Sequence, residues 1–254
     1  MINLDLIPTV APKQLNKDSA KEETKDMVEA IGELQIRLFA EKKQSLLVIM
    51  QGLDGTGKDS TTNDLFKDCT HAGVNVAYFK KPTEEEAAHD FIWRAHRQTP
   101  QKGIIQVFNR SYYEDILIHW VHGWIDNDRR DARMKHINAF EQLLVEEGNT
   151  TIIKFYMHIS YEEQEKQLTE RVEEAHKFWK HNDGDWAERK LWDKYRKAYE
   201  FALNKSELAW TILPCDQEWY RDYVAAKTVL EALTRMNPQF PALKSTLFSG
   251  EKKQ

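Results

Sequence analysis

The chain has 254 residues, of which 41% are hydrophobic and 30% are charged, and its formal net charge is −5. This length suits one domain with a sizeable core, and no run approaches the 18 apolar residues that a membrane span needs. The first residues lack the basic and apolar regions of a secretory signal, so none is expected. Two cysteines, Cys69 and Cys215, are too few for a disulfide framework or a cysteine-rich zinc site. We therefore expect a cytoplasmic protein that binds no membrane, and the acidic balance argues against a broad surface for nucleic acid.

The predicted elements alternate between strands and helices. Residues 1–20 are expected to form a loose arm, and residues 238–254 a polar, mobile tail. Short apolar or β-branched runs predict five strands, at residues 45–50, 74–79, 104–108, 150–157 and 210–213. Helical spacing and helix-start signals predict helices over about 21–42, 58–72, 83 onward, 112–122, 130–147, 161–175, 186–205 and 218–236. This order predicts an α/β protein, a three-layer α/β/α fold with a mostly parallel five-stranded sheet, as a single domain over residues 1–254.

A glycine-rich loop follows the first predicted strand. Residues 52–58 read GLDGTGK, which matches the pattern G-x-x-x-x-G-K and lies between a buried strand and a helix, as this pattern requires. Backbone N–H groups of such a loop and the positive end of the helix attract phosphate, and Lys58 adds a full charge. The alternative is a chance glycine-rich turn. We predict that phosphate is bound by six consecutive residues, Gly55, Thr56, Gly57, Lys58, Asp59 and Ser60.

Two carboxylates lie in or beside this loop, at Asp54 and Asp59. A P-loop NTPase carries Ser or Thr where this chain has Asp59. A carboxylate repels phosphate unless a metal ion lies between them, and Mg²⁺ prefers carboxylate and phosphate oxygens. We therefore predict Mg²⁺ as a cofactor, with Asp54 and Asp59 among its ligands. The alternative for Asp59 is that it only stabilises the first turn of the helix.

A second group of candidate residues follows the third predicted strand. Residues 108–115 read FNRSYYED, and parallel sheets bind their ligands beyond the carboxyl ends of the strands. Arg110 is expected to clamp a transferring phosphoryl group. Glu114 or Asp115 is expected to hold Mg²⁺ or to orient the acceptor, although Glu114 also fits a helix capping box. The strand ends in Asn109 where a P-loop kinase usually has Asp, and this departure weakens the metal assignment.

Basic residues are expected close to the loop. Lys80 and Lys81 end the second predicted strand at the same edge of the sheet, and Arg94 lies on the next helix. Residues of about 160–205 form charge-rich helical stretches before the last strand, where nucleotide kinases carry a mobile lid. Arg171 lies on the first of these stretches, and arginine suits bidentate phosphate binding. For any single lysine the alternative is a solvated helix face.

Together these motifs resemble those of family-2 polyphosphate kinases. The matching segments occur in order within about residues 25–236, at 52–59, 81–86, 89–94, 108–115, 192–195 and 214–220. The resemblance implies a P-loop kinase-like fold with a helical lid, and reversible transfer of the terminal phosphoryl group of inorganic polyphosphate to nucleotides with Mg²⁺. It implies adenine nucleotides as partners, with guanine nucleotides as an alternative, and a homo-oligomer. The Tyr-Glu-Asp form of the second motif is similar to the subgroup that phosphorylates both AMP and ADP.

The resemblance also assigns roles to the matching residues. The candidate catalytic set is Asp54, Lys58, Arg110, Glu114, Asp115 and Arg171. Phosphate contacts outside the loop are assigned to Lys80, Lys81 and Arg94, of which Lys81 and Arg94 are placed near the polyphosphate. The candidate metal ligands are Asp54, Asp59 and Asp115.

Two other functions stay open at this level. The first is a nucleoside monophosphate kinase that uses ATP as its donor, against which Asp59 and the Lys80–Lys81 pair argue. The second is a non-catalytic module that binds nucleotide or polyphosphate, against which the presence of both acidic motifs argues. A comparison of polyphosphate with ATP as phosphoryl donor distinguishes these functions.

Overall fold

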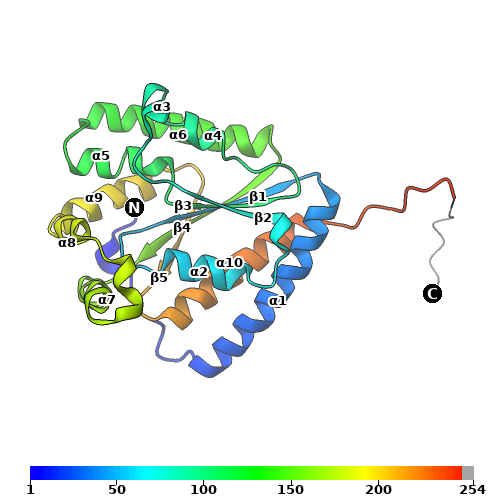
Figure 1. The fold of residues 1–254 in the computed structure, drawn as a ribbon, viewed down its shortest axis with the longest axis horizontal. Coiled ribbons are helices and arrows are strands. Elements are labelled where there is room, and N and C mark those ends of the chain that lie inside the picture. The colour runs from blue at the N-terminus through cyan, green and yellow to red at the C-terminus, as the bar shows by residue number, and fades with distance from the viewer. Residues whose placement is uncertain (248–254) are drawn as a thin grey trace.

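A computed structural model describes residues 1–247 and places five parallel strands between two layers of helices (Figure 1). The strand order is β2 (Val74–Tyr78), β3 (Ile105–Asn109), β1 (Ser45–Gln51), β4 (Thr150–His158) and β5 (Trp210–Pro214). Every residue of β1 and β3 is buried, as expected for central parallel strands covered on both faces. The three-layer α/β/α prediction is confirmed, and the sheet is wholly parallel.

The two faces of β1 carry separate cores. Leu46, Val48 and Met50 point into one core, which is covered by α1 (Lys17–Glu41), α2 (Lys58–Phe66) and α10 (Glu218–Met236). Leu47 and Ile49 point into the other core, which is covered by α4 (Trp93–His96), α5 (Ile118–Val121), α6 (Asn127–Glu146) and α9 (Trp192–Lys205). Alternate residues of a strand face opposite sides, so this apolar run fills both cores. The remaining helices, α3 (Glu84–Ala88), α7 (Tyr161–Glu173) and α8 (Asp183–Arg189), lie at the rim (Figure 1).

The amino-terminal segment differs from its prediction as a loose arm. Leu4 is buried, and its N–H donates to Glu200 at 2.8 Å, while the N–H of Ile2 donates to Asn204 at 2.6 Å. Thr9 donates its hydroxyl to Asp216 at 2.6 Å. These contacts tie the segment to α9 and to the loop before α10. Their partners are about 200 residues away, so local sequence patterns carry no sign of them.

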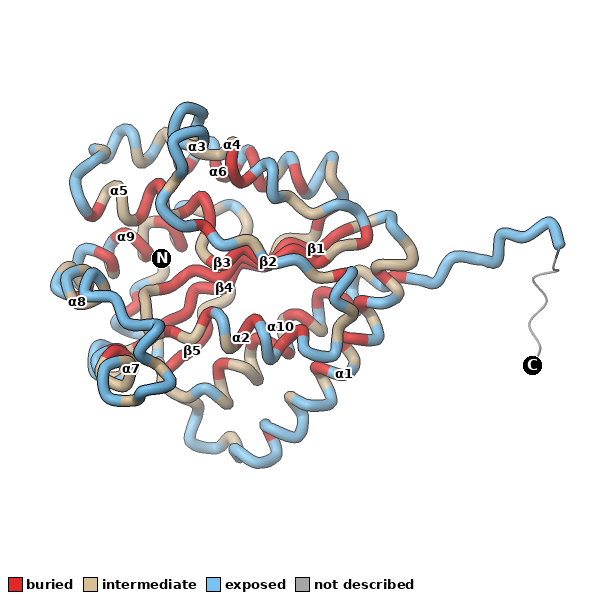
Figure 2. The backbone as a smooth tube through the Cα atoms, in the orientation of Figure 1, coloured by how far each residue is buried: buried red, intermediate tan, exposed pale blue. Residues whose placement is uncertain are grey.

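Two helical predictions need correction. A single helix over 112–122 was expected, but the chain forms a 3₁₀ turn, Tyr112–Asp115, and the short α5. The helix expected over about 186–205 is divided into α8 and α9, and α9 buries Tyr195, Tyr199 and further side chains in the core. Within the region predicted as a lid, exposed and intermediate residues predominate in α7, a 3₁₀ helix (Ala175–Lys180) and α8 (Figure 2), and we call these three the lid elements.

Other features of the described chain bear on the remaining predictions. The capping box of Thr83 and Glu86 is present at α3. Residues 238–247 form neither helix nor strand, and the rest of the predicted tail, 248–254, lies outside the described residues. Within residues 1–247, no helix is long and apolar enough to cross a membrane.

A buried polar network fixes the turn after β3. Lys154 and Glu141 form a fully buried ion pair at 2.6 Å. The hydroxyls of Tyr112 and Tyr113 each donate to Glu141 at 2.9 Å, and Lys154 also donates to the Tyr113 oxygen at 2.9 Å. Because buried charges are costly unless they are paired and hydrogen-bonded, each member depends on the others. The network holds the tyrosines that precede Glu114 and Asp115 against α6 and β4.

We expect Lys154→Met to destabilise the protein by about 3–5 kcal/mol, because it leaves Glu141 as an unpaired buried charge. Urea unfolding followed by circular dichroism measures this difference. The control is Lys135→Met on the exposed side of α6, which should change the free energy of unfolding by less than about 0.5 kcal/mol. A loss below about 1 kcal/mol for Lys154→Met would contradict the assigned role.

Candidate active site at the carboxyl edge of the sheet

The phosphate loop has the backbone of an anion-binding site. Gly55 and Gly57 adopt φ values of +89° and +84°, which favour glycine, so the tight turn between β1 and α2 depends on them. Gly57 caps α2, and no side chain bonds to the first N–H groups of this helix. Free N–H groups and a helix dipole at the start of a helix are suited to bind phosphate. Lys58 is buried and donates to the carbonyls of Gly52 and Leu53 at 2.9 Å each.

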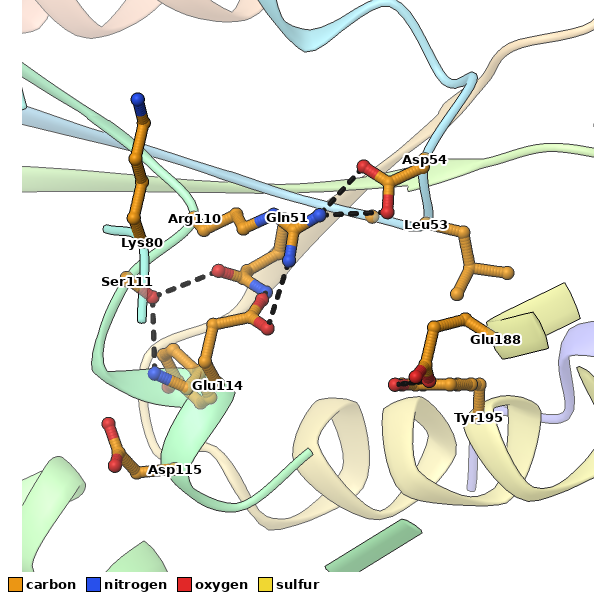
Figure 3. A network of polar contacts seen from close by, with 12 residues as sticks. Gln51, Leu53, Asp54, Lys80, Arg110, Ser111, Glu114, Asp115, Glu188 and Tyr195 are labelled. Carbon is orange, nitrogen blue, oxygen red and sulfur yellow. Dashed lines mark hydrogen bonds and ion pairs between the residues drawn. The ribbon is translucent and has the colours of Figure 1, made fainter. Parts of the chain in front are cut away.

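Arg110 and Asp54 form the central ion pair of the site (Figure 3). One terminal nitrogen of Arg110, Nη2, lies 2.7 and 2.8 Å from the two carboxylate oxygens of Asp54. Burial pushes the pKa of the Asp54 carboxyl upward, but Lys58 and Arg110 outweigh this effect and hold it below its ordinary value. Glu114 and, after it, Asp54 raise the pKa of Arg110, which stays charged. Asp54 is therefore ionised and available to a cation at neutral pH.

Glu114 faces the same centre and is held in place by its neighbours. Gln51 donates to its carboxylate at 2.8 Å, and Arg110 Nη1 lies 3.5 Å from it. Ser111 donates to the side-chain amide oxygen of Gln51, Oε1, at 3.2 Å, so the last residue of β1 and the turn after β3 are joined (Figure 3). Both carboxylates beside Arg110 are thus fixed by adjacent strands of the sheet.

The largest cavity at this edge lies on one side of the phosphate loop. Its volume is about 790 Å³. Apolar and aromatic side chains form one part of its lining: Tyr78, Phe79, Pro82, Ile118 and Trp124. Cations form another part, namely Lys58, Lys80, Lys81, Arg94 and Arg110, with the acids Asp54, Asp59 and Glu114. A mixed lining of this kind suits a ligand that has a flat apolar part and a charged part.

A second, smaller cavity of about 240 Å³ lies on the other side of the loop, and we call it the lid groove. Its cations are Lys58, Arg171, Lys177, Lys180 and Arg221, and its acids are Asp54, Asp59, Glu170 and Glu218. Its remaining lining is formed by Gly55, Gly57, Ser60, Gln167 and Cys215, so it contains no aromatic or branched aliphatic wall. The two cavities share three residues, Asp54, Lys58 and Asp59.

The structure therefore gathers most of the predicted residues, in two groups. Lys80, Lys81 and Arg94 line the large cavity together with Arg110. Arg171 lines the lid groove and pairs with Asp185 at 2.7 Å. Thr56 is also buried in the loop, where its hydroxyl donates to the carbonyl of Leu53.

Asp115 lies apart from the Arg110–Asp54 pair, and its role as a metal ligand stays a prediction. Its buried carboxylate lies 3.4 Å from Arg94 and 3.6 Å from His119, and Figure 3 shows it apart from the Arg110–Asp54 pair. Within the described chain, no group of three or more His, Cys, Asp or Glu side chains could hold a metal ion. Asp54, Asp59 and Asp115 therefore do not form one cluster. Asp115 lies on the side of the 3₁₀ turn that faces Arg94, which also lies 3.9 Å from Glu86.

Sequence patterns missed residues that contact the loop from later elements. Gln164 of α7 is buried and donates to the backbone oxygen of Asp54 at 3.0 Å. Arg221 of α10 lines the lid groove. Neither residue belongs to the loop pattern or to the segment after β3. Their position beside residues 52–60 arises only when β4 and β5 pair beside β1, although Arg221 directly follows the late segment 214–220.

The pKa of Asp115 leads to a pH-dependent prediction. Burial raises it from 3.8 to about 6, even though Arg94 and Arg133 act in the opposite direction. Between about pH 4 and pH 6 the folded protein therefore binds more protons than the unfolded chain, and this contribution to stability falls as pH rises through about 6. We compare the free energy of unfolding of Asp115→Asn with that of the parent protein. We expect the value for the variant, relative to the parent, to rise by at most about 3 kcal/mol from pH 4 to pH 7. Urea unfolding at both pH values measures this gain, and an equal difference at the two would contradict it.

Comparisons with known proteins agree with this geometry. The family described as Polyphosphate kinase 2 (PPK2) matches residues 14–241. An AMP/ADP-polyphosphate phosphotransferase of Meiothermus ruber is 39% identical over 228 residues, which cover 89% of this chain and 85% of that protein. An ADP-polyphosphate phosphotransferase of Rhodopseudomonas palustris is 33% identical over 256 residues, which cover 94% and 88%.

A solved structure of a polyphosphate kinase 2 is also similar to this chain. The crystal structure of Polyphosphate Kinase 2 from Arthrobacter aurescens TC1 matches with a TM-score of 0.91 and 37% identity, covering 96% of this chain and 89% of that one. A family match across most of the chain, two relatives above 30% identity and this structural likeness all point the same way. The chain belongs to the polyphosphate kinase 2 family of phosphotransferases.

Proposed function

We propose that this protein transfers the terminal phosphoryl group of inorganic polyphosphate to AMP, ADP or both, reversibly and with Mg²⁺. The names of the two relatives support these substrates. The observation that carries the proposal is the chemical difference between the two cavities that meet at Asp54, Lys58 and Asp59. A donor and an acceptor of unlike chemistry can approach one phosphate loop from opposite sides.

The nucleotide acceptor belongs in the large cavity. Tyr78, Phe79 and Trp124 offer an apolar surface to a base, and the cations of the same cavity face its phosphates. In this proposal Lys81 and Arg94 bind phosphates of the nucleotide, whereas the resemblance places them near the polyphosphate.

Polyphosphate belongs in the lid groove, which has cations but no apolar wall. An ATP donor at the same place would leave its base without such a wall, so the groove favours a donor made only of phosphate. This difference separates the proposal from an ATP-dependent nucleoside monophosphate kinase.

The reaction needs positioning more than proton transfer. A terminal phosphate oxygen of the acceptor attacks the terminal phosphorus of polyphosphate, and the anhydride bond to the next phosphate breaks. The shortened chain leaves with the electron pair of that bond on its own oxygen. Since the attacking oxygen is already anionic, no strong base is required. Lys58 and Arg110 neutralise charge on the transferring group, and Arg110 must exchange Asp54 for phosphate to do so.

The loop residues fit a magnesium ion. Mg²⁺ is usually held by one or two carboxylates together with substrate phosphates, and Asp54 and Asp59 line both cavities. Asp59 also accepts a hydrogen bond from Asn109, which orients its carboxylate beside the loop. When bound, the ion would supply charge neutralisation on the phosphate oxygens. The homo-oligomer implied by the resemblance stays a prediction.

We expect Lys58→Ala and Asp54→Asn each to lower the rate of transfer at least a hundredfold, since each removes a charge that both cavities share. The measurement is ATP formation from purified protein, ADP, polyphosphate and Mg²⁺, with folding checked by circular dichroism. Lys166→Ala, an exposed change on α7, should retain the parent rate. Near-normal rates in either folded site variant would contradict the proposed site.

The choice of donor tests the proposed function itself. Polyphosphate and ATP are compared as phosphoryl donors to AMP at equal concentrations of terminal phosphoryl groups. We expect turnover with polyphosphate to exceed turnover with ATP at least tenfold. A preference for ATP would favour the monophosphate kinase, and no turnover with either donor, for AMP or ADP, would favour the binding module.

A further inference from the structure

Arg221 is a buried cation beside the phosphate loop that the loop pattern does not include. It lies in the first turn of α10 and is 3% exposed. A buried guanidinium requires a counter-ion, and Asp222 supplies one, accepting from Arg221 Nε at 2.9 Å and from Nη2 at 3.3 Å. This pairing accounts for the charge of Arg221 but not for its position over the loop.

The position of Arg221 is set by contacts with the loop backbone. Nη1 donates to the carbonyl oxygen of Thr56 at 3.4 Å, and Nη2 donates to the Ser60 hydroxyl at 3.3 Å. A Cβ added at Gly57 would come within 2.1 Å of Nη1. The guanidinium thus lies directly against the glycine that caps α2, where the N–H groups for phosphate begin. Glycine at this position serves the close approach of Arg221 as well as the positive φ.

The hydrogen bonds of Arg221 leave donor capacity on the groove side. A guanidinium has five N–H groups, and the bonds to Asp222, Thr56 and Ser60 use at most four of them. Arg221 also lines the lid groove. An N–H group of Nη1 therefore remains for an anionic oxygen, and charged hydrogen bonds of this kind are the stronger ones.

Two other cations of the lid groove, Arg171 and Lys177, differ from Arg221 in what holds them. Arg171 pairs with Asp185, and Lys177 pairs with Glu170 and Glu174, so these lid cations pair with acids of the lid itself. Arg221 instead belongs to α10, which packs along α1 and against the sheet. Its guanidinium is fixed relative to the loop whatever the position of the lid.

We propose that Arg221 binds a phosphate of the polyphosphate donor in the lid groove, next to the one held by the phosphate loop. This inference rests on the proposed function, because it assigns the lid groove to the donor. Arg221 would be a fixed residue that binds the phosphoryl donor, in addition to Lys58 of the loop and Arg171 of the lid. The nucleotide, on the far side of the loop, makes no contact with Arg221.

The test compares Arg221→Gln and Arg221→Lys with Lys227→Gln, an exposed change of the same charge on the same helix. KM is measured for polyphosphate and for the nucleotide acceptor, and binding of inorganic polyphosphate is measured by calorimetry without nucleotide. We expect Arg221→Gln to raise the KM and the Kd for polyphosphate about tenfold to a hundredfold, the range of one charged hydrogen bond. The KM for the nucleotide should change less than twofold, and Lys227→Gln should match the parent.

Each outcome has a definite meaning. Unchanged polyphosphate binding in Arg221→Gln, or an equal rise in both KM values, would overturn the inference and indicate a purely structural role. If Arg221→Gln does not fold, Arg221→Lys decides in the same way, because it keeps the charge and loses the planar fork. If the parent protein transfers nothing from polyphosphate, the proposed function fails. In that case the calorimetric comparison still tests Arg221 as a polyphosphate-binding residue.

Discussion

The contact between Arg110 and Asp54 determines how the rest of the site is arranged. The two residues follow β3 and β1, which pair in parallel with Met50 opposite Asn109. The Arg110 N–H donates to the Met50 carbonyl at 3.0 Å, and Arg110 has a φ of +60°. A non-glycine residue in this region costs about 1 kcal/mol or more, so it persists only where other contacts hold it. Here the arginine reaches across the strand ends to Asp54, which lines both cavities.

That ion pair also imposes a constraint on the chemistry. Arg110 donates to both oxygens of Asp54 through one terminal nitrogen, while its other terminal nitrogen faces Glu114. The guanidinium cannot serve both carboxylates and a transferring phosphoryl group through the same N–H groups. In the proposed reaction Nη2 exchanges Asp54 for phosphate, while Nη1 still faces Glu114, which Gln51 also holds. The buried Glu141–Lys154 network behind the turn keeps the backbone in place during such an exchange.

The sequence predicts those parts of the fold and the site whose contacts are formed between residues close together in the chain. The phosphate loop and the segment after β3 are each continuous in sequence, so their residue types indicate their chemistry. The sheet that brings them together is predicted by the alternation of apolar runs with helical segments. The sequence does not show which way Asp115 faces, because adjacent residues of a tight turn face different surroundings, and its pairing with Arg94 depends on the fold. Gln164 and the amino-terminal segment depend on partners more than 100 residues away. No local spacing encodes such pairings.

The lid groove gathers cations in a chain whose net charge is −5. Among the cations of the lid groove, Arg171 and Lys177 pair with acids of the lid elements or the residue next to them, and Arg221 pairs with its neighbour Asp222. An acidic chain can therefore gather cations in one groove without a basic surface, because these three are paired with carboxylates when no phosphate is bound. In the proposed function, a phosphate chain must compete with these carboxylates for the three cations. Such competition lowers affinity per phosphate and suits an enzyme that must release a shortened chain after every transfer.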